Sequence, residues 1–585
     1  MNLTLKIGGA AGEGVMAAGA IFSKALVRAG LYISTTVEYP SLIRGGHNVY
    51  IIRASEDEIT SLVKPVNLLV ALNNETIQLH KDELSDDAGI IYDSNDQTVD
   101  ISQINSKICL YPVPLLKIAT QDGGKKLMMN NVALGSAWAV IDLPLEILTK
   151  VIADVFANKN QEIINDNQKA AKAGFDYVKN NPPAGKQIFP YRLKLGKAAE
   201  QLVLTGNEAI GLGAIKAGLG FASLYPMTPI NGLLNFLAGH EKENGFIYFQ
   251  PEDEIAGINS AIGASYAGLR SLVATSGGGF SLMEEGFGMA VMTETPLVVV
   301  MGTRPGPSSG LPTWTGQGDL KFLLGTSQGD FMRVILAPGD PLEAYELTQI
   351  AFNLADKYQM PVFLLVDKFL CESIGTIEKD ALRHCEEGAK GDRRGNLKDC
   401  FADARNDDSF KNYKRYKINS NGISPRAIPG QVYFVTNSYE HDDLGYSTED
   451  ASVIKAMVEK RARKYESLAK EVPEPVVYGE HDAEVTLVGW GSTKGTAREA
   501  ILGIKELGIR ANCLHLNWIN PFPKEAVTRI LSGAKKIIDV EGNPSGQMAG
   551  WIREQTGIEI KDKILKYDGR QFYPEDIIEG VKKYV

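Results

Sequence analysis

Hydrophobic positions recur along this chain in short runs that alternate with longer stretches of helical spacing. The clearest series lies between residues 202 and 370, where apolar runs such as SLVATS and PLVVVMG stand beside stretches with apolar residues three or four positions apart. Short apolar runs predict buried strands, and the longer stretches predict helices. Strands that alternate with helices favour a mostly parallel sheet with helices on both faces.

The same alternation opens the chain and returns near its end, so we predict an α/β protein with three α/β domains. At 585 residues the chain is too long for one ordinary core. We place the first domain at 1–185, the second at 200–372, a charged connecting arm at 373–475 and the third domain at 476–585. A proline-rich linker, Pro182-Pro183-Ala184-Gly185, follows the first domain. The arm ends in a capped amphipathic helix within EHDDLGYSTEDASVIKAMVEKRARKYESLAKE.

A glycine-rich run, Gly8–Gly14, follows the first strand and precedes a helix-like stretch. Backbone N–H groups in such a turn attract phosphate. Glycines also allow close packing of helix on strand, and the residues leave both interpretations open. In the next strand pair, Arg44 precedes Gly45-Gly46, which indicates a turn that presents a cation.

Reactive side chains gather where the strands of the second domain end. Two prolines flank Thr228, which excludes the middle of a helix or of a central strand. We therefore predict a strand-to-helix junction with Thr228 as the N-cap and Pro229 as the first helical residue. Open α/β sheets bind ligands at the carboxyl ends of their strands. Four consecutive strand ends would bring together Thr228, the acidic run Glu252-Asp253-Glu254, the turn Gly277-Gly278-Gly279 and Arg304.

These stretches resemble the 2-oxoacid:ferredoxin oxidoreductases, which use thiamine diphosphate. YPMTP is similar to the family's Tyr-Pro-Ile-Thr-Pro signature, with Met227 in place of Ile. RPGPSSGLPTWTGQGDL matches the family's Arg-x-Gly-Pro-Ser-Thr-Gly-x-Pro-Thr run and departs from it only at Ser309. NGISPRAIPG and EHDDLGYSTED look like further alpha-chain stretches. Over nearly its whole length the chain resembles a fused gamma–alpha subunit, with a gamma-like domain, a pyrimidine-binding domain and a transketolase carboxyl-terminal-like domain.

The resemblance implies a reaction and a role for particular residues. The reaction is the coenzyme A-dependent oxidative decarboxylation of a 2-oxoacid, 2-oxoglutarate or a broad range, which yields acyl-CoA, CO₂ and electrons for ferredoxin. Glu254 would be the catalytic carboxylate on the aminopyrimidine ring, and Glu252 is the alternative. The other implied contacts are Tyr225 and Pro226 to the cofactor, Thr228, Arg304 and Thr313 to the substrate, and Gly12, Gly14 and Arg44 to coenzyme A.

Missing motifs imply a partner. The chain has no Gly-Asp-Gly, the start of the motif that holds diphosphate and Mg²⁺ in thiamine enzymes, and its five cysteines include no CxxC pair. By resemblance, a separate beta subunit supplies diphosphate binding, Mg²⁺ and a [4Fe–4S] cluster, and this chain holds no metal. The assembly implied is a heterodimer or heterotetramer.

Composition narrows the remaining choices. A net charge of −10 and a pI near 5.5 argue against nucleic acid or an anionic membrane as partners. No run reaches the roughly 18 apolar residues of a membrane span, and MNLTLKIGG does not read as a signal peptide. With scattered cysteines, we expect a cytoplasmic protein. Two alternatives stay open: another kind of thiamine enzyme, transketolase-like or lipoamide-linked, and a non-catalytic nucleotide-binding assembly subunit.

Overall fold

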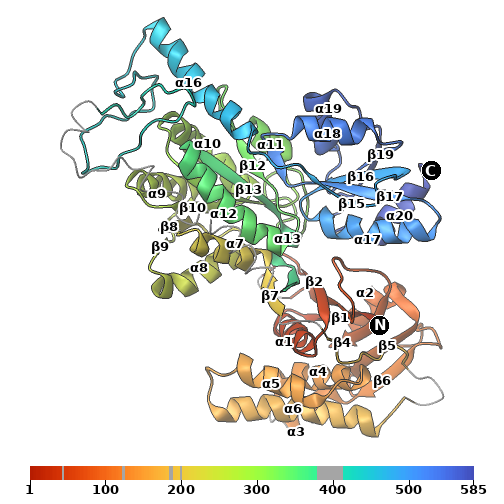
Figure 1. Cartoon of the computed structure of the whole chain (residues 1–585). Helices are drawn as coiled ribbons and strands as arrows, with labels where there is room; N and C mark the ends of the chain where they lie inside the picture. Colours follow the sequence, from red (N-terminus) through yellow and green to blue (C-terminus); the bar gives the residue numbers. More distant parts are fainter. Residues whose placement is uncertain (43–44, 122–124, 184–188, 198–200, 379–412) are drawn as a thin grey trace. The chain divides into compact units, whose positions relative to one another are not determined.

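The protein is described by a computed structural model that covers residues 1–42, 45–121, 125–183, 189–197, 201–378 and 413–585 (Figure 1). It is an α/β protein with three sheets, as the sequence predicts. The chain forms two compact units. The first contains residues 1–204 and short later segments, and the second contains most of the remainder.

The first unit is built on an eight-stranded mixed sheet in the order β6-β5-β4-β1-β3-β2-β14-β7. Its strands are β1 Asn2–Ala10, β2 Tyr32–Glu38, β3 His47–Ser55, β4 Val66–Ala71, β5 Leu84–Asp93, β6 Cys109–Val113, β7 Gln201–Thr205 and β14 Ile374–Glu378. Its helices are α1 Val15–Arg28, α2 Asn74–His80, α3 Leu115–Gln121, α4 Met129–Val140, α5 Leu145–Val155 and α6 Gln161–Asn180. In Figure 1, α3 to α6 form one group. In the core, the rings of Phe22 on α1 and Trp138 on α4 meet edge to face, with their centroids 5.2 Å apart.

The turn in the glycine-rich run near the amino terminus is shorter than the sequence predicts. Strand β1 continues through Gly8 and Gly9 to Ala10, because Gly8 is paired with Val49 on one side and Ala71 on the other. A Cβ on Gly8 would lie 2.5 Å from the side chain of Thr76. Close packing therefore explains these two glycines, and only residues 11–14 form the turn before α1.

The second unit contains a seven-stranded sheet in the order β18-β12-β13-β11-β10-β8-β9. Its strands are β8 Phe221–Leu224, β9 Ile247–Phe249, β10 Ser271–Thr275, β11 Leu297–Thr303, β12 Val334–Leu336, β13 Pro361–Asp367 and β18 Trp518–Asn520. The helices are α7 Gly206–Lys216, α8 Asn231–Asn244, α9 Glu254–Tyr266, α10 Gly277–Met292, α11 Leu320–Gly325, α12 Pro341–Tyr358 and α13 Lys368–Glu372. Helix α7 packs against α8 and α12, and α9 packs against α10.

The carboxyl-terminal part of the chain forms a five-stranded sheet in the order β15-β17-β16-β19-β20. The elements are α16 Ala451–Ala469, β15 Val476–Gly479, β16 Val485–Trp490, α17 Thr493–Glu506, β17 Ala511–Leu516, α18 Lys524–Ser532, β19 Ile537–Glu541, α19 Gln547–Thr556, β20 Asp562–Leu565 and α20 Pro574–Lys582. One core cluster includes Phe363 from the seven-stranded sheet and Trp490 from the five-stranded sheet. Strand β18, from the carboxyl-terminal part of the chain, also pairs with β12. The two sheets therefore share a core. The domain boundaries given above stay predictions.

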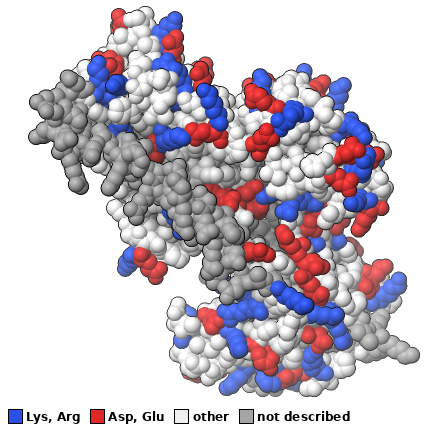
Figure 2. Space-filling model, viewed as in Figure 1, with Lys and Arg blue, Asp and Glu red and all other residues white. Residues whose placement is uncertain are grey.

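Charged side chains of both signs are mixed over the face of the molecule in Figure 2. Within the described residues, none of the helices is both long and apolar enough to cross a membrane. The predicted amphipathic helix of the arm is α16, and Asp450 caps it by accepting hydrogen bonds from the backbone of Ser452 and Val453.

Candidate active site

Four parallel strands end at one edge of the seven-stranded sheet. Strands β11, β10, β8 and β9 are neighbours and run in the same direction. The strand order reverses between β8 and β10, because the chain moves from β8 outward to β9 and then returns to the other side of β8. A reversal of this kind opens a crevice at the strand ends, where ligands bind in open α/β sheets. The loops after β8 and β10 meet there: Ser276 Oγ donates to Met227 Sδ at 2.8 Å.

The loop after β8 differs from the predicted junction. Helix α8 begins at Asn231 with Ile230 at the N-cap position, and no side chain caps it. Thr228 is therefore not the cap, because the backbone N–H of Ile230 donates to the carbonyl of Met227 and closes a separate turn first. The Thr228–Pro229 peptide bond is cis. Tyr225 is partly buried and Pro226 is exposed at the end of β8.

Glu254 is the first residue of α9, and its side chain is buried. Asp253 caps the helix by accepting the Ala256 N–H at 2.7 Å, so the two carboxylates have different tasks. A Cβ on Gly279 would lie 2.7 Å from Glu254 Oε1, which places the carboxylate directly against the first turn of α10. In the described part of the chain, the Glu254 carboxylate accepts no hydrogen bond and forms no ion pair. Glu252, the alternative, is exposed.

Arg304 follows β11 and reaches across the strand ends. Its Nη1 donates to the carbonyl oxygen of Thr228 at 3.0 Å, which brings two of the predicted substrate contacts together. Burial lowers the pKa of Arg304, and the negative charge of Asp319 opposes that change. Asp319 accepts a hydrogen bond from Thr303 Oγ1 at 2.7 Å; burial raises the pKa of Asp319, and the Thr303 hydroxyl and the Arg304 charge oppose the rise.

Thr313 lies further along the same loop and is buried. Its hydroxyl has no hydrogen-bond partner among the described residues, so it contacts neither Thr228 nor Arg304 through a hydrogen bond. The loop is fixed at Gln317, whose backbone and side chain exchange hydrogen bonds with Gly542 and Asn543 of the five-stranded sheet region. The loop that carries Thr313 is thus anchored to the five-stranded sheet region through Gln317.

Sequence reasoning missed Asp319 and the packing role of Gly279. Asp319 lies in the quoted run RPGPSSGLPTWTGQGDL, so the signal was present, but a single aspartate ahead of an apolar stretch has the pattern of an ordinary helix start. In the structure the same carboxylate faces Arg304 instead. A Cβ on Gly277 would lie 3.1 Å from Asp319 Oδ2, so Asp319 also approaches the start of α10.

The coenzyme A contacts predicted in the first unit are only partly described. Gly12 has a φ of +96°, and a Cβ added to it would meet no atom within 4 Å. Gly14 has a φ of +78° and is the N-cap of α1. Both positive φ angles favour glycine. Arg44 lies outside the described residues.

Three family models match separate parts of the chain. Residues 4–177 match pyruvate ferredoxin/flavodoxin oxidoreductase, residues 212–460 match the thiamine diphosphate-binding domain of pyruvate flavodoxin/ferredoxin oxidoreductase, and residues 483–577 match pyruvate:ferredoxin oxidoreductase core domain II. The alpha subunit of 2-oxoacid:ferredoxin oxidoreductase 2 from Aeropyrum pernix is 32% identical, over 100% of this chain and 98% of that one. The chain belongs to the 2-oxoacid:ferredoxin oxidoreductases, as an alpha subunit.

Two further relatives agree with this assignment. A 2-oxoacid:ferredoxin oxidoreductase alpha subunit from Saccharolobus solfataricus is 34% identical, over 100% of this chain and 98% of that protein. The solved 2-oxoglutarate:ferredoxin oxidoreductase from Magnetococcus marinus superposes with a TM-score of 0.89 at 31% identity, covering 100% of this chain and 99% of that chain; that structure has 2-oxoglutarate, coenzyme A and succinyl-CoA bound.

Membership of the 2-oxoacid:ferredoxin oxidoreductases confirms the resemblance seen in YPMTP and RPGPSSG. It also confirms that the chain is part of an enzyme, which decides against an assembly subunit without catalysis and against the other kinds of thiamine enzyme. The region that matches the thiamine diphosphate-binding model contains Thr228, Glu254, Arg304 and Thr313. As an alpha subunit, the chain acts together with other subunits of the oxidoreductase.

Proposed function

We propose that this alpha subunit, with a beta subunit, converts a 2-oxoacid and coenzyme A into acyl-CoA and CO₂ and passes the electrons to ferredoxin. The observation that carries the proposal is the Arg304 guanidinium, held at the end of β11 by the Thr228 carbonyl. Every 2-oxoacid has a carboxylate beside its reacting carbonyl, and the planar fork of arginine suits a carboxylate. Arg304 would anchor that carboxylate, and Thr228 would lie beside it.

The residues at the strand ends fit the pyrimidine side of thiamine diphosphate. Glu254 is buried yet its carboxylate has no partner among the described residues, which is the arrangement expected of a group reserved for a ligand. When bound, thiamine diphosphate supplies the electron sink that a 2-oxoacid needs in order to lose CO₂. Glu254 would hold a proton at a ring nitrogen of the aminopyrimidine, with Tyr225 and Pro226 as neighbouring contacts.

The remaining cofactors belong to the partner in this proposal. Among the described residues there is no group of three or more His, Cys, Asp or Glu side chains placed to hold a metal ion. The missing Gly-Asp-Gly supports a beta subunit that would bring Mg²⁺, the diphosphate site and the [4Fe–4S] cluster, in a heterodimer or heterotetramer. The free thiols of Cys109, Cys371 and Cys513 are buried, in keeping with a cytoplasmic enzyme.

Coenzyme A is proposed as the acyl acceptor because the relative from Magnetococcus marinus has coenzyme A and succinyl-CoA bound. Gly12 and Gly14 in the turn before α1 are candidate contacts, and Arg44 stays a candidate from the sequence alone. The same relative, together with the fused gamma–alpha form of this chain, supports 2-oxoglutarate or a broad range of 2-oxoacids as substrate.

The test is acyl-CoA formation by the purified complex across a panel of pyruvate, 2-oxobutyrate and 2-oxoglutarate, with ferredoxin reduction followed in parallel. We expect coenzyme A-dependent turnover with at least one of them and equal amounts of acyl-CoA and CO₂. A complex that contains Glu254→Gln is the matched negative control. CO₂ release without any acyl-CoA would contradict the proposal, since it would indicate a different fate for the acyl group.

A further inference from the structure

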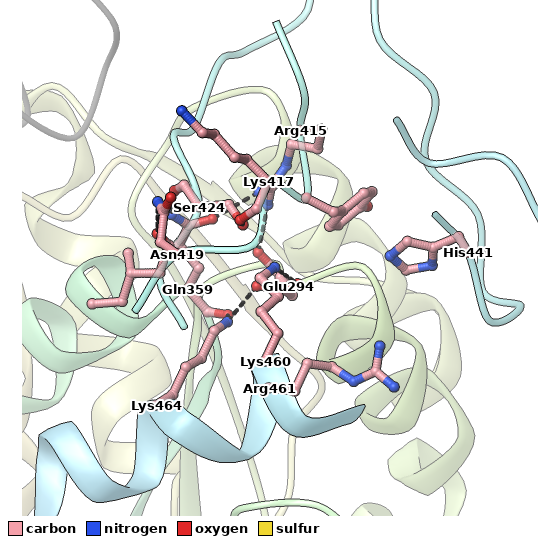
Figure 3. A network of polar contacts seen from close by, with 12 residues as sticks. Glu294, Gln359, Arg415, Lys417, Asn419, Ser424, His441, Lys460, Arg461 and Lys464 are labelled. Carbon is pink, nitrogen blue, oxygen red and sulfur yellow. Dashed lines mark hydrogen bonds and ion pairs between the residues drawn. The ribbon is translucent and has the colours of Figure 1, made fainter. Parts of the chain in front are cut away.

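A buried cluster of charged side chains joins Glu294, which follows α10, to Lys460 and Lys464 on α16 (Figure 3). Glu294 forms ion pairs with Lys460 and Lys464, and Lys464 Nζ lies 2.5 Å from Glu294 Oε2. Arg415 donates to the Glu294 carbonyl at 2.8 Å and to Gln359 Oε1 at 2.8 Å. Two cations therefore pair with the single carboxylate of Glu294, and a third, Arg415, is held nearby by the Glu294 backbone carbonyl and by Gln359.

This excess of positive charge affects every member of the cluster. Burial alone would raise the pKa of Glu294, but the cations of Lys464, Lys460 and Arg415 outweigh it and lower the pKa strongly. Burial lowers the pKa of Lys460 to about 8, and the Glu294 charge only partly opposes this because Lys464 and Arg415 repel the same proton. Buried charges are normally balanced by partners, so a cluster with a net charge of about +2 favours an anion nearby.

A cavity of about 560 Å³ lies beside this cluster, and Lys464 forms part of its wall. The volume falls within the range of roughly 300–1,000 Å³ typical of small-molecule pockets. Part of the cavity lining is apolar, and it includes Val291, Leu324, Phe331, Met360 and Trp551.

Arg461 is the residue that gives the cavity a hydrogen-bond donor. Its Nη2 donates to Glu440, while Nη1 is buried and has no partner within the described residues. Three residues further along α16, Lys464 lines the same cavity, so both cations lie on one side of the helix. The Lys464 Nζ is paired with Glu294 and donates to the Gln359 carbonyl at 3.2 Å, so Lys464 contributes charge and Arg461 contributes the free donor. The guanidinium of Arg333, also in the lining, has its donors taken by backbone carbonyls, including that of Thr326 at 2.9 Å.

The carboxylates around the cavity offset only part of this positive charge. Asp330 lies near Arg333, and Glu440 is paired with Arg461. Glu466 is exposed, so water screens it. His441 adds no positive charge, because burial lowers the pKa of its imidazole.

We propose that this cavity binds a small organic anion, with the anionic group on Arg461 Nη1 beside Lys464 and the hydrocarbon part against the apolar wall. The site is separate from the strand-end crevice. The chemistry that it would recognise is one negative charge on a compact apolar body, as in an aromatic or branched carboxylate.

The test uses the purified complex and two probes of nearly equal shape, 1-naphthoate and its uncharged amide, 1-naphthamide, with binding measured by calorimetry. We expect naphthoate to bind more tightly than the amide. Arg461→Gln should weaken naphthoate about tenfold or more, as expected for loss of a charge-assisted hydrogen bond, and leave the amide unchanged. Arg463→Gln is the matched control, because Arg463 is two positions away and does not line the cavity.

A second variant keeps the test decisive if Arg461→Gln disturbs folding. Ala462 is exposed and lines the cavity, so Ala462→Trp should fill it and abolish binding of both probes without removing a charge. Equal affinity for naphthoate and naphthamide, or unchanged naphthoate binding in Arg461→Gln, would overturn the proposal. Absence of naphthoate binding to the complex would also overturn it, and would favour a partner chain as the occupant of the cavity.

Discussion

Replacing Gly279 by alanine should displace the Glu254 side chain while leaving its carboxylate chemically unchanged. The added Cβ would lie 2.1 Å from Thr275 Oγ1, 2.7 Å from Glu254 Oε1 and 2.9 Å from Glu254 Cγ. Thr275 is fully buried in β10, so the added methyl can be accommodated only if the first turn of α10 shifts or the side chains of Thr275 and Glu254 both move. Either change alters the position of Glu254 relative to α10. Overpacking of this kind costs about 1–3 kcal/mol. The gain from alanine over glycine in a helix, roughly 0.5–1 kcal/mol, offsets part of that cost.

The effect on turnover should exceed the effect on stability. A shift of about 1 Å in a catalytic group can reduce the rate on the order of 100-fold. The assays are acyl-CoA formation and thermal unfolding of the complex. Two controls separate packing from helix propensity: Gly278→Ala on the same helix and Gly263→Ala in the middle of α9, since neither added Cβ meets an atom within 4 Å. If Gly279→Ala matches Gly263→Ala in turnover, Glu254 does not have the role assigned to it.

Three further predictions concern single groups. Glu254→Gln should keep the thermal midpoint and lower turnover about 10²–10⁴-fold; a rate above half of wild type would contradict this. Arg304→Ala should lower kcat/KM roughly 10–150-fold for pyruvate and 2-oxoglutarate alike, whereas Thr313→Ala should change their ranking; a loss confined to 2-oxoglutarate would assign Arg304 to the distal carboxylate. Finally, burial, followed by the charges of His80 and Lys6, lowers the pKa of His47 to about 4. Below pH 6.5 the unfolded chain therefore binds a proton that the folded chain does not, so the unfolding midpoint should fall between pH 6.5 and 4. His47→Gln should flatten that slope in calorimetric scans, and an unchanged slope would exclude His47 as its source.

The sheet that carries the candidate site could be predicted well because its signal is local. The runs SLVATS and PLVVVMG correspond to β10 and β11 within one or two residues, and the ends of the four consecutive strands do lie at one edge. The carboxyl ends of these strands lie together because the strands pair in parallel, and the alternation of strands and helices already predicts parallel pairing.

Contacts made across long loops could not be predicted in this way. Thr228 was expected to cap α8, but a turn that begins at Met227 delays the helix. Asp319 lies fifteen residues after Arg304, and its approach to that side chain depends on the path of a loop rich in proline and glycine. Gly8 and Gly9 were grouped with the turn because the sequence does not show whether a glycine lies in a crowded strand or in a loop. Only their neighbours in the fold, Thr76 beside Gly8 and Leu72 beside Gly9, show that both are packed in a strand.

The hydrogen bonds that Gln317 makes with Gly542 and Asn543 have a consequence for protein engineering. A loop exchanged between homologues to alter substrate choice would arrive without its anchor if only residues near 304–320 were transplanted. A chimaera should therefore move the segment around Gly542–Asn543 together with the loop. On the proposal that Thr313 in this loop selects among substrates, the carboxyl-terminal sheet would act as part of the selectivity module, and we expect the two regions to evolve in step.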